Sequence, residues 1–365
     1  MFDHTQYIPC LRWKTGEYQA IWNLPATTKK TITPLIEVPE FSFDFAEKEK
    51  PKTIDKHIER FVKRVRDKWG EMACFIDMKY IPHSKNMKDG KNPIAFIFDE
   101  LLKMGCSPIP VAGLDRDDLY KEEVKKVLSK NKSVGICLRI PIESFVESQF
   151  ENNLNSMLAK LKIELKNAHL IVDLGAPNFV PLEGFVKAIR ETISQYSKLR
   201  EWLTFSIIGT SFPEIINKGV SILSRYEWLL YKELINVFAK KGLRFPAFGD
   251  YTIIYPGVAP DLDWRRIRSA AKVKYTINDG WYIVKGQSLR EGPRTQCHDI
   301  CRELVKSPHF FGQDFSYGDR FIKKCATDKT VKTRNHTLWI KAGTNHHLMK
   351  ATRDIANFYA SSKNL

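Results

Sequence analysis

The fold is decided by three successive segments, ITPLIEVPE (32–40), TIDKHIERFVKRVRDKWG (53–70) and ACFIDMKY (73–80). The first and third are short apolar runs, typical of strands that are covered on both faces. The second places apolar residues at helical spacing and ends at Gly70, a common helix stop. A strand, a helix and a second strand in this order form the repeating unit of a parallel sheet.

The same alternation continues along the chain. Further apolar runs, most of them followed by helix-like stretches, are SPIPVAGLD (107–115), SVGICLRIP (133–141), AHLIVDLG (168–175), LTFSIIGTS (203–211) and FPAFGDYTII (245–254). The eighth strand would be KVKYTI (272–277) or WYIVKG (281–286), unless these two form a hairpin across Asn278-Asp279-Gly280. About eight such units predict an α/β fold, a (β/α)8 TIM-barrel-like domain with helical additions at both ends.

We expect residues 1–365 to form a single domain, because no linker long enough to separate two domains is present. Within it, we assign residues 1–30 to an N-terminal addition that contains a short helix. Residues from about 31 to 306 would form the barrel, and residues from about 307 to 365 would form a C-terminal extension packed on it.

The composition indicates a cytoplasmic globular protein. With 43% hydrophobic residues the chain can bury a large core, and no run reaches the ~20 apolar residues of a membrane span, so we expect no membrane partner. The start, MFDHTQYIPC, does not follow the pattern of a secretory signal. The seven cysteines are odd in number and scattered, which favours reduced thiols.

The chain is strongly basic, with 58 Lys and Arg against 42 Asp and Glu, a net charge of +16. Such a charge favours a polyanionic partner such as nucleic acid, although a generally basic solvated surface explains it equally well. The densest late clusters are WRRIRSAAKVK (264–274) and IKKCATDKTVKTR (322–334). Because aromatic residues lie near the first cluster and can stack on bases, its candidate nucleic-acid-binding residues are Arg265, Arg266, Arg268, Lys272 and Lys274.

Charged residues stand at the ends of the predicted strands, where the active sites of barrel enzymes lie. These residues are Glu37, Asp77, Lys79, Asp115, Arg139, Asp173 and Asp250. If the side chains converge, Glu37, Asp77 and Asp173 would be metal ligands for Mg²⁺ or Mn²⁺, and Lys79 and Arg139 would hold a phosphate. The alternative is a structural ion-pair network without turnover, and parity along the strands leaves both interpretations open.

Two further motifs contain residue types that bind metals. His346 and His347 are adjacent on a predicted helix and point in different directions, so at most one would join a site. His346 is our candidate general acid or base, and a role in locking the C-terminal helix is the alternative. Cys297-His298-x-x-Cys301 lacks a second, similarly spaced pair, so we expect the two cysteines to pack inward rather than bind zinc.

Two segments carry a family resemblance. YIPCLRWKTGEYQAI (7–21) contains a W-K-x-G-E motif, and HTLWIKAGTNHHLMKATRDIANF (336–358) contains W-x-x-x-G-x-x-H-H. Together with ITPLIEVPE they make the chain resemble the phage beta protein family over essentially its full length. The matching positions are Trp13, Lys14, Gly16, Glu17, Glu37, Trp339, Gly343, His346 and His347. The resemblance implies an origin among phages and mobile elements, but it brings no established catalytic residues.

From these observations we predict a nucleic-acid-binding or partner-binding protein, linked to phage conflict or defence. Its partners would be nucleic acid and a protein encoded by a neighbouring defence gene. The first alternative is a metal-dependent phosphodiesterase or nuclease that uses the strand-end carboxylates. The second is an interaction module that recognises a phage component. Whether the chain is an enzyme stays open at this point.

Overall fold

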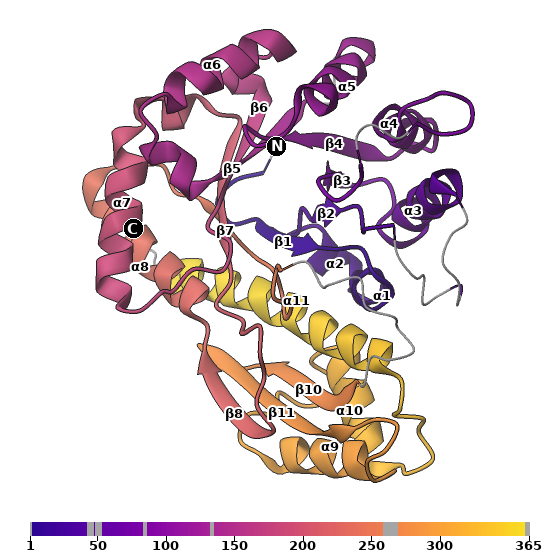
Figure 1. Ribbon diagram of the computed structural model, residues 1–365. Helices are drawn as coiled ribbons and strands as arrows, with labels where there is room; N and C mark the ends of the chain where they lie inside the picture. The colour runs from indigo at the N-terminus through magenta and orange to yellow at the C-terminus, as the bar shows by residue number, and fades with distance from the viewer. Residues whose placement is uncertain are drawn as a thin grey trace.

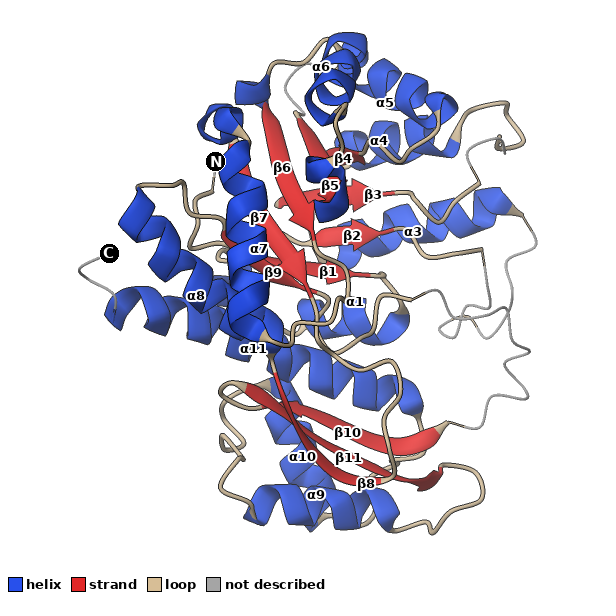
Figure 2. Cartoon of the chain, turned by 60° about the vertical axis from the view of Figure 1, so that its left-hand side comes forward, coloured by secondary structure: helices blue, strands red, loops and turns tan. Residues whose placement is uncertain are grey.

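A closed barrel of eight parallel strands forms the larger part of the computed structural model, which describes residues 2–41, 47, 53–82, 86–131, 135–257 and 269–361. Around the barrel the strand order is β1-β2-β3-β4-β5-β6-β7-β9. Figure 1 shows β1 to β7 of this barrel, and Figure 2 also labels β9. The strands are β1 (Tyr7–Leu11), β2 (Leu35–Glu37), β3 (Ala73–Asp77), β4 (Ser107–Ala112), β5 (Ile136–Pro141), β6 (Ala168–Asp173), β7 (Thr204–Gly209) and β9 (Ala247–Asp250). The predicted TIM-like α/β barrel is therefore confirmed.

Helices surround the barrel, and the longer ones pack an apolar face against the strands. They are α1 (Thr15–Trp22), α2 (Ala26–Lys29), α3 (Ile54–Lys68), α4 (Pro93–Lys103), α5 (Asp118–Lys130), α6 (Phe150–Leu161), α7 (Leu182–Gln195) and α8 (Tyr226–Lys241). Short 3₁₀ helices are η1 (Ile142–Val146), η2 (Leu165–Asn167) and η3 (Ser197–Glu201). In α3, for example, Ile58, Phe61 and Val65 are buried at helical spacing, and the Thr53 hydroxyl accepts a hydrogen bond from the Lys56 N–H to start the helix.

Two apolar cores follow from this arrangement. The larger lies between the strands and the surrounding helices, and it includes the predicted helical face of α3. The smaller fills the barrel interior, where side chains such as Phe75, Val111, Ile171 and Ile208 point inward from different strands. The interior is thus a packed core rather than a pore, as expected for this fold.

The predicted barrel boundaries need correction. β1 lies within residues 1–30, the predicted N-terminal addition, and it pairs with both β2 and β9. The barrel therefore closes at Asp250, so the eighth strand is not at 272–277 or 281–286 and the barrel does not reach residue 306. The physical reason is the turn at Asp279-Gly280, which favours a hairpin, so that 272–277 and 281–286 pair with each other.

The remaining part of the chain forms what we call the small sheet unit. Its strands β8 (Gly219–Ser224), β10 (Ala270–Thr276) and β11 (Gly280–Ser288) make an antiparallel sheet in the order β10-β11-β8. The helices α9 (Gln296–Lys306) and α10 (Tyr317–Thr327) complete the unit. Figure 2 shows it on one side of the barrel, with the long helix α11 (His336–Ser361) running between the two parts.

The cysteine and membrane predictions can be compared with this fold. All seven cysteines are buried as free thiols, and Cys297 and Cys301 pack inward from α9 as expected. The Cys297 thiol contacts the Thr333 carbonyl at 3.8 Å. Among the described helices, none combines the length and the apolar character that crossing a bilayer needs.

Candidate functional site

Arg139 stands at the centre of a charged network at the carboxyl ends of the barrel strands. Its Nη1 donates to Glu37 Oε1 at 2.7 Å and to Asp77 Oδ2 at 2.9 Å. Its Nε donates to Asp173 Oδ2 at 2.8 Å, and its Nη2 donates to the Tyr251 hydroxyl at 2.8 Å. The structure thus brings together four of the predicted residues, from β2, β3, β5 and β6, in the space at the barrel mouth.

Further cations complete this mouth network. Lys79, which we predicted to hold a phosphate, lies with its Nζ 2.8 Å from Glu37 Oε1. Arg116, which sequence reasoning missed, lies 3.0 Å from Asp77 Oδ2 and also pairs with Asp115. Each of the three carboxylates therefore contacts at least one Arg or Lys side chain.

The network favours the ionised forms of Glu37 and Asp173. Burial alone would raise the pKa of Glu37, but Arg139 and Lys79 outweigh it and lower that pKa to about 2. Burial would likewise raise the pKa of Asp173, but Arg139, the Tyr251 hydroxyl and the Gly175 N–H lower it. Acids and bases are thus balanced within the mouth, which is the arrangement of a structural ion-pair network.

A divalent metal does not fit this arrangement. The Arg139 guanidinium occupies the position between Glu37, Asp77 and Asp173 that a shared Mg²⁺ or Mn²⁺ would need. Across the described ranges, no group of three or more His, Cys, Asp or Glu side chains could hold a metal ion. The geometry of the mouth therefore supports no catalytic step through a metal.

Asp250, the last of the predicted strand-end residues, joins a different cluster. Its Oδ1 accepts from the Tyr7 hydroxyl at 2.6 Å, and its Oδ2 accepts from His347 Nε2 at 2.9 Å. The Thr276 hydroxyl lies 2.8 Å from the other ring nitrogen of His347, so the neutral ring satisfies both contacts. Burial lowers the pKa of His347, which fits a neutral imidazole. This cluster fastens α11 and β10 to the end of β9.

His346 contacts groups that lie away from Arg139. Its Nε2 donates to the Thr276 carbonyl at 2.7 Å, and its Nδ1 lies 2.8 Å from Asp319 Oδ2. Its ring stacks on Tyr275 with centroids 3.8 Å apart, and the side chain is fully buried. The geometry is that of a helix lock between α11, α10 and β10, which is the alternative role set out for the two histidines.

A second feature, which we call the basic cleft, lies between the barrel and the small sheet unit and has a volume of about 680 Å³. Seven Lys and Arg side chains line it against two carboxylates, Glu17 and Glu40. The basic residues are Arg12, Lys14, Arg64, Lys272, Lys274, Arg290 and Arg334. Arg12 connects the cleft to the mouth network, because its Nε lies 3.8 Å from Glu37 Oε2.

The two family motifs build one wall of the basic cleft. Glu17 accepts hydrogen bonds from the backbone N–H groups of Arg12 and Lys14, each at 3.2 Å, and so fixes the turn that starts α1. Gly16 lets α1 approach α11, since a Cβ at this position would lie 2.5 Å from Ile340 Cγ2. Residues of the first turns of both α1 and α11 line the cleft.

Positive charge is crowded on the β10 side of the cleft. Burial and the nearby Lys272 lower the pKa of Lys274 to about 7, and Lys274 Nζ donates to the Ile253 carbonyl at 2.7 Å. Burial, followed by the two lysines, lowers the pKa of His336 to about 4. Burial also raises the pKa of Glu17 to about 7, so this carboxylate only partly offsets the lysines at neutral pH.

The basic cleft contains two of the predicted nucleic-acid-binding residues. Lys272 and Lys274 line it, whereas Arg265, Arg266 and Arg268 lie outside the described residues. Sequence reasoning missed most of the other basic side chains of the cleft. Lys14 carried a signal as part of the W-K-x-G-E motif, and Arg334 carried one as the last residue of the basic cluster at 322–334. Arg64 and Arg290 reach the cleft only through folding.

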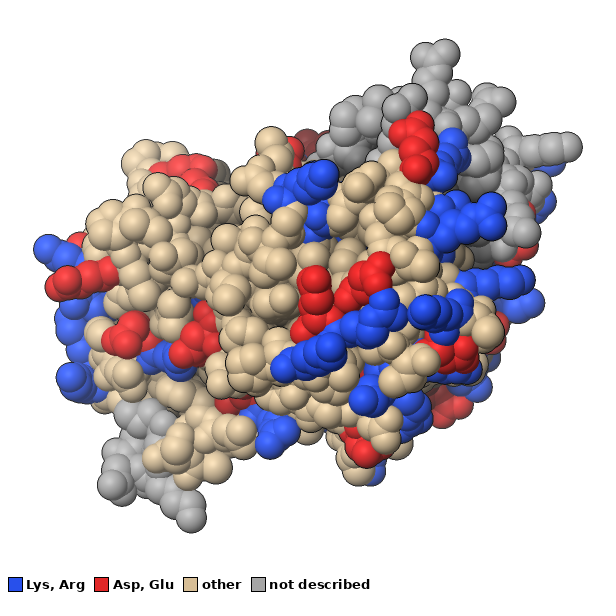
Figure 3. Space-filling model, turned by 90° about the horizontal axis from the view of Figure 1, so that it is seen from below, with Lys and Arg blue, Asp and Glu red and all other residues tan. Residues whose placement is uncertain are grey.

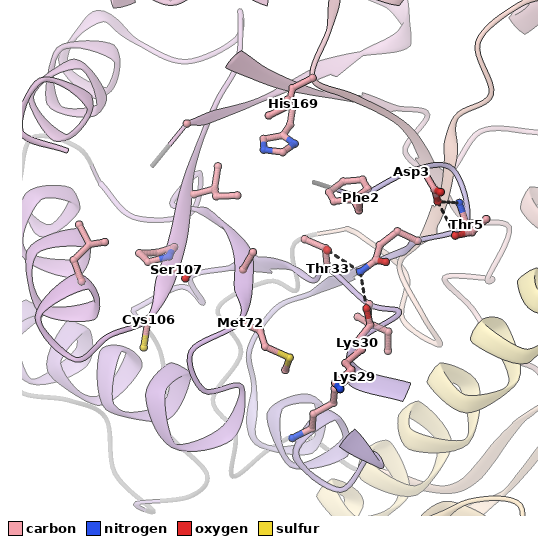
Figure 4. A pocket seen from close by; sticks show the side chains of 18 residues that line it. Phe2, Asp3, Thr5, Lys29, Lys30, Thr33, Met72, Cys106, Ser107 and His169 are labelled. Carbon is pink, nitrogen blue, oxygen red and sulfur yellow. Dashed lines mark hydrogen bonds between the residues drawn. The ribbon is translucent and has the colours of Figure 1, made fainter. Parts of the chain in front are cut away.

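Other regions offer less to an anion. On the face in Figure 3, Lys and Arg are interspersed with Asp and Glu. They surround a broad area of residues that are not Lys, Arg, Asp or Glu. A cavity of about 860 Å³ opens at the amino-terminal end of the strands, and Figure 4 shows Phe2 and His169 on one side of it and Lys29 and Lys30 on another. Phe2 stacks on His169 with centroids 5.7 Å apart. The active sites of characterised TIM-barrel enzymes lie at the opposite end of the strands.

Comparison with known proteins places the chain in a family. The family described as Beta protein matches residues 7–353. "Protein beta" of Enterobacteria phage P4 is 23% identical over 364 residues, covering 96% of this chain and 93% of that protein.

Similarity to solved structures is low. A trimodular GH5_4 subfamily endoglucanase has a TM-score of 0.30 and 8% identity, and the match covers 66% of this chain. It spans 57% of that chain, less than two thirds of its length. The N-terminal domain of a Bacteroides vulgatus protein has a TM-score of 0.34 and 11% identity over 98% of both chains. Neither match carries an argument about function.

Proposed function

The chain belongs to the Beta protein family, and we propose that it binds nucleic acid in the basic cleft. The observation that carries this proposal is the lining of one cavity of about 680 Å³ by seven Lys and Arg side chains and only two carboxylates. Contacts between such side chains and phosphates dominate the affinity of proteins for nucleic acids. The net charge of +16 would further speed the encounter with a polyanion.

The basic side chains are held in place before any ligand arrives. Arg334 Nη2 donates to the Gly292 carbonyl at 2.9 Å, and Arg12 Nη2 donates to the Gly257 carbonyl at 2.7 Å. Carbonyl partners fix a guanidinium without neutralising it, so the positive charge of Arg334 stays available to a phosphate. Arg12 is also fixed, but Glu37 and Glu40 at 3.8 Å and 3.6 Å partly offset its charge. Preorganisation of this kind reduces the entropy cost of binding.

The other predicted functions have less support. A metal-dependent nuclease would need the mouth carboxylates, and these contact Arg139, Lys79 and Arg116 instead. An interaction module that recognises a phage component would bind without steep salt dependence. The link to phage conflict or defence, and a protein partner encoded nearby, are part of the proposal and rest on the similarity to a phage P4 protein.

Binding of labelled single- and double-stranded DNA and RNA, measured by fluorescence anisotropy over a range of salt concentrations, tests the proposal. We expect affinity to fall steeply as salt rises, and we expect Lys272→Ala to weaken binding and reduce the salt slope by about 1. The matched control is Lys241→Ala, which removes the same charge from an exposed position at the end of α8. No binding at low salt, or an equal loss in the control, would refute a ligand site in the cleft.

The nuclease alternative is tested in the same samples. We expect the nucleic acids to remain intact after incubation with Mg²⁺, with Mn²⁺ and with chelator. Cleavage that needs metal and disappears in Asp173→Asn would favour the mouth as a phosphodiesterase site. Thermal unfolding of the variant would show that any loss of cleavage is not a loss of fold.

A further inference from the structure

We propose that the basic cleft binds a terminal phosphate carried on a single nucleotide unit, rather than the side of a strand or a duplex. This inference rests on the proposed function, because the ligand binds in the same cleft. It adds which chemical group of the ligand the cleft recognises, namely a terminal phosphate. A phosphomonoester of this kind comes from two sources, the phosphorylated end of a single strand or a free nucleotide. The reasons are the size of the cleft, its local charge and its unused hydrogen-bond donors.

The size of the cleft excludes a duplex. A cavity of about 680 Å³ lies in the range that encloses one small-molecule ligand. The major groove of B-DNA alone is about 12 Å wide, so a duplex lies against such a cavity but does not enter it. One nucleotide unit, with its base, sugar and phosphate, is therefore the part of a nucleic acid that the cleft can enclose.

The charge within the cleft is uneven, and the imbalance lies on the β10 side. Glu40 pairs with Lys14 at 3.0 Å and with Arg12 at 3.6 Å, which neutralises the α1 side. Lys272 and Lys274 point to the same face of β10, two residues apart, and His336 at the start of α11 lies close enough for both lysines to lower its pKa. We call these three residues the phosphate seat.

The phosphate seat suits a doubly charged group. In the described part of the chain, neither lysine of the seat forms an ion pair within 4.0 Å, although Glu17 lies close enough to raise the pKa of Lys274. A terminal phosphate carries about −1.5 to −2 at neutral pH and three acceptor oxygens, whereas an internal phosphodiester carries a single charge. The terminal group therefore gains more from two adjacent lysines than an internal phosphate does.

Unused hydrogen-bond donors point to the same ligand. α1 begins at the cleft, and the N–H groups at the start of a helix are suited to a phosphate. α11 also begins there, but its Thr337 N–H already donates to Asn335 Oδ1 at 3.0 Å. Independently, Trp13 lines the cleft with only 2% of its surface exposed, and its indole Nε1–H has no hydrogen-bond partner among the described residues. A buried donor without an acceptor is costly, and a polar atom of the ligand would satisfy it.

The backbone at Trp13 adds a further sign of a ligand site. Its φ of 51° lies in the left-handed region, which is rare for a bulky residue and costs free energy. Glu17 maintains this turn through its hydrogen bonds to the backbone N–H groups on either side, those of Arg12 and Lys14. Conformations of this kind persist where a ligand site requires them.

Short oligonucleotides of one sequence test the inference by equilibrium binding. The series has a 5′-phosphate, a 3′-phosphate, no terminal phosphate, or a circular strand without ends, and nucleoside mono- and triphosphates serve as the free-nucleotide probes. We expect one phosphate-ended form to bind about tenfold more tightly than the unphosphorylated and circular forms. Lys272→Ala should abolish this preference, Trp13→Phe should weaken it, and Lys241→Ala should retain it.

Each outcome separates the inference from the proposed function. If the circular strand binds as tightly as the phosphate-ended strands, the inference is overturned and nucleic-acid binding stands. If free nucleotides bind but no strand does, the phosphate seat is supported and nucleic-acid binding is overturned. If folded Lys272→Ala still prefers phosphate-ended strands, or if nothing binds at all, the phosphate seat does not bind a terminal phosphate. Lys272 is only half-buried, so its alanine variant is expected to fold. The test therefore still holds if Trp13→Phe fails to fold.

The pH dependence of binding gives a second readout of the seat. Lys274 faces Lys272 on its own strand, Glu17 on α1 and His336 on α11, and its pKa in the free protein is about 7. A bound dianion raises that pKa, so binding above pH 7 takes up a proton, and affinity should fall as pH rises from 7 to 9. Glu17 ionises over the neutral range and acts in the same direction. Affinity that rises over this range would contradict the seat.

Discussion

At the scale of single residues, Arg139 matters most, because it contacts three carboxylates that would otherwise face one another. Its side chain is 3% exposed, and Glu37 and Asp77 are 1% and 0% exposed. The sequence placed these residues at strand ends, and β-strand parity allowed them to converge if those faces point inward. It did not predict Arg116 or Tyr251, which follow their strands in loops whose paths no periodicity encodes.

We expect Arg139→Met to reduce the free energy of unfolding by about 3 to 5 kcal/mol, because it leaves several buried carboxylates without their shared cation. Urea unfolding monitored by circular dichroism measures the change. The control is Arg66→Ala, which breaks an exposed pair with Glu71 and should cost no more than about 1 kcal/mol. Equal losses in the two variants would show that the mouth network contributes little.

At the scale of elements, the sequence predicted most barrel strands and helices but missed β1 and β8. β1 is a five-residue strand with a proline at its centre, so it did not stand out from the segment around it. β8 is largely exposed and pairs only with β11, and its alternation is weak. Short or edge strands form because of pairing and packing with neighbouring strands, and a single sequence does not show which strands will be neighbours.

The small sheet unit depends on close helix packing, which glycine substitutions test. A Cβ at Gly318 in α10 would collide with the Ala342 carbonyl of α11, so Gly318→Ala should lower the free energy of unfolding by about 1 to 3 kcal/mol. Gly184→Ala is the matched control, because this exposed position in α7 has its nearest atom 3.7 Å away. It should raise the free energy of unfolding by up to about 1 kcal/mol. Loss of stability in the control would contradict the packing argument.

At the scale of the whole molecule, two buried polar networks hold the parts together. One closes the barrel mouth around Arg139, and the other joins β9, β10 and α11 through Asp250, His347 and Thr276. The basic cleft lies where barrel and small sheet unit meet, so its shape depends on both networks. The sequence could not predict this cleft, because its lining comes from segments at both ends of the chain.

The networks predict a loss of stability in acid. Glu37 has its pKa lowered to about 2, and the pKa values of Asp173, Asp250 and Asp319 are also lowered by their buried partners. Since these pKa values are lower in the folded than in the unfolded state, their contribution is complete above pH ~4.5 and is lost as pH falls toward 2. The unfolding temperature, measured by calorimetry, should fall steeply over that window.

A control separates the network from general acid effects. Glu37→Gln should reduce stability at neutral pH and make the unfolding temperature fall less steeply in acid, because the residue no longer titrates.

Glu17 and Glu227 affect the pH dependence of stability in the opposite direction, since burial raises the pKa of each to about 7. Their contribution is greatest below pH ~4.5 and declines as pH rises through 7. An unchanged unfolding temperature from pH 5 to pH 2.5 would contradict the assigned shifts.

The pairing of β1 with β9 has a consequence for how the chain is made. β1 leaves the ribosome first, but one of its two neighbours is the last barrel strand, and the bonded pair Tyr7 and Asp250 is 243 residues apart. During synthesis β1 must therefore wait beside β2 while the intervening barrel is translated. His347 reaches Asp250 from still later in the chain, so the seam is locked only when α11 has emerged. We expect nascent chains that end before α11 to be far more sensitive to protease than the finished protein.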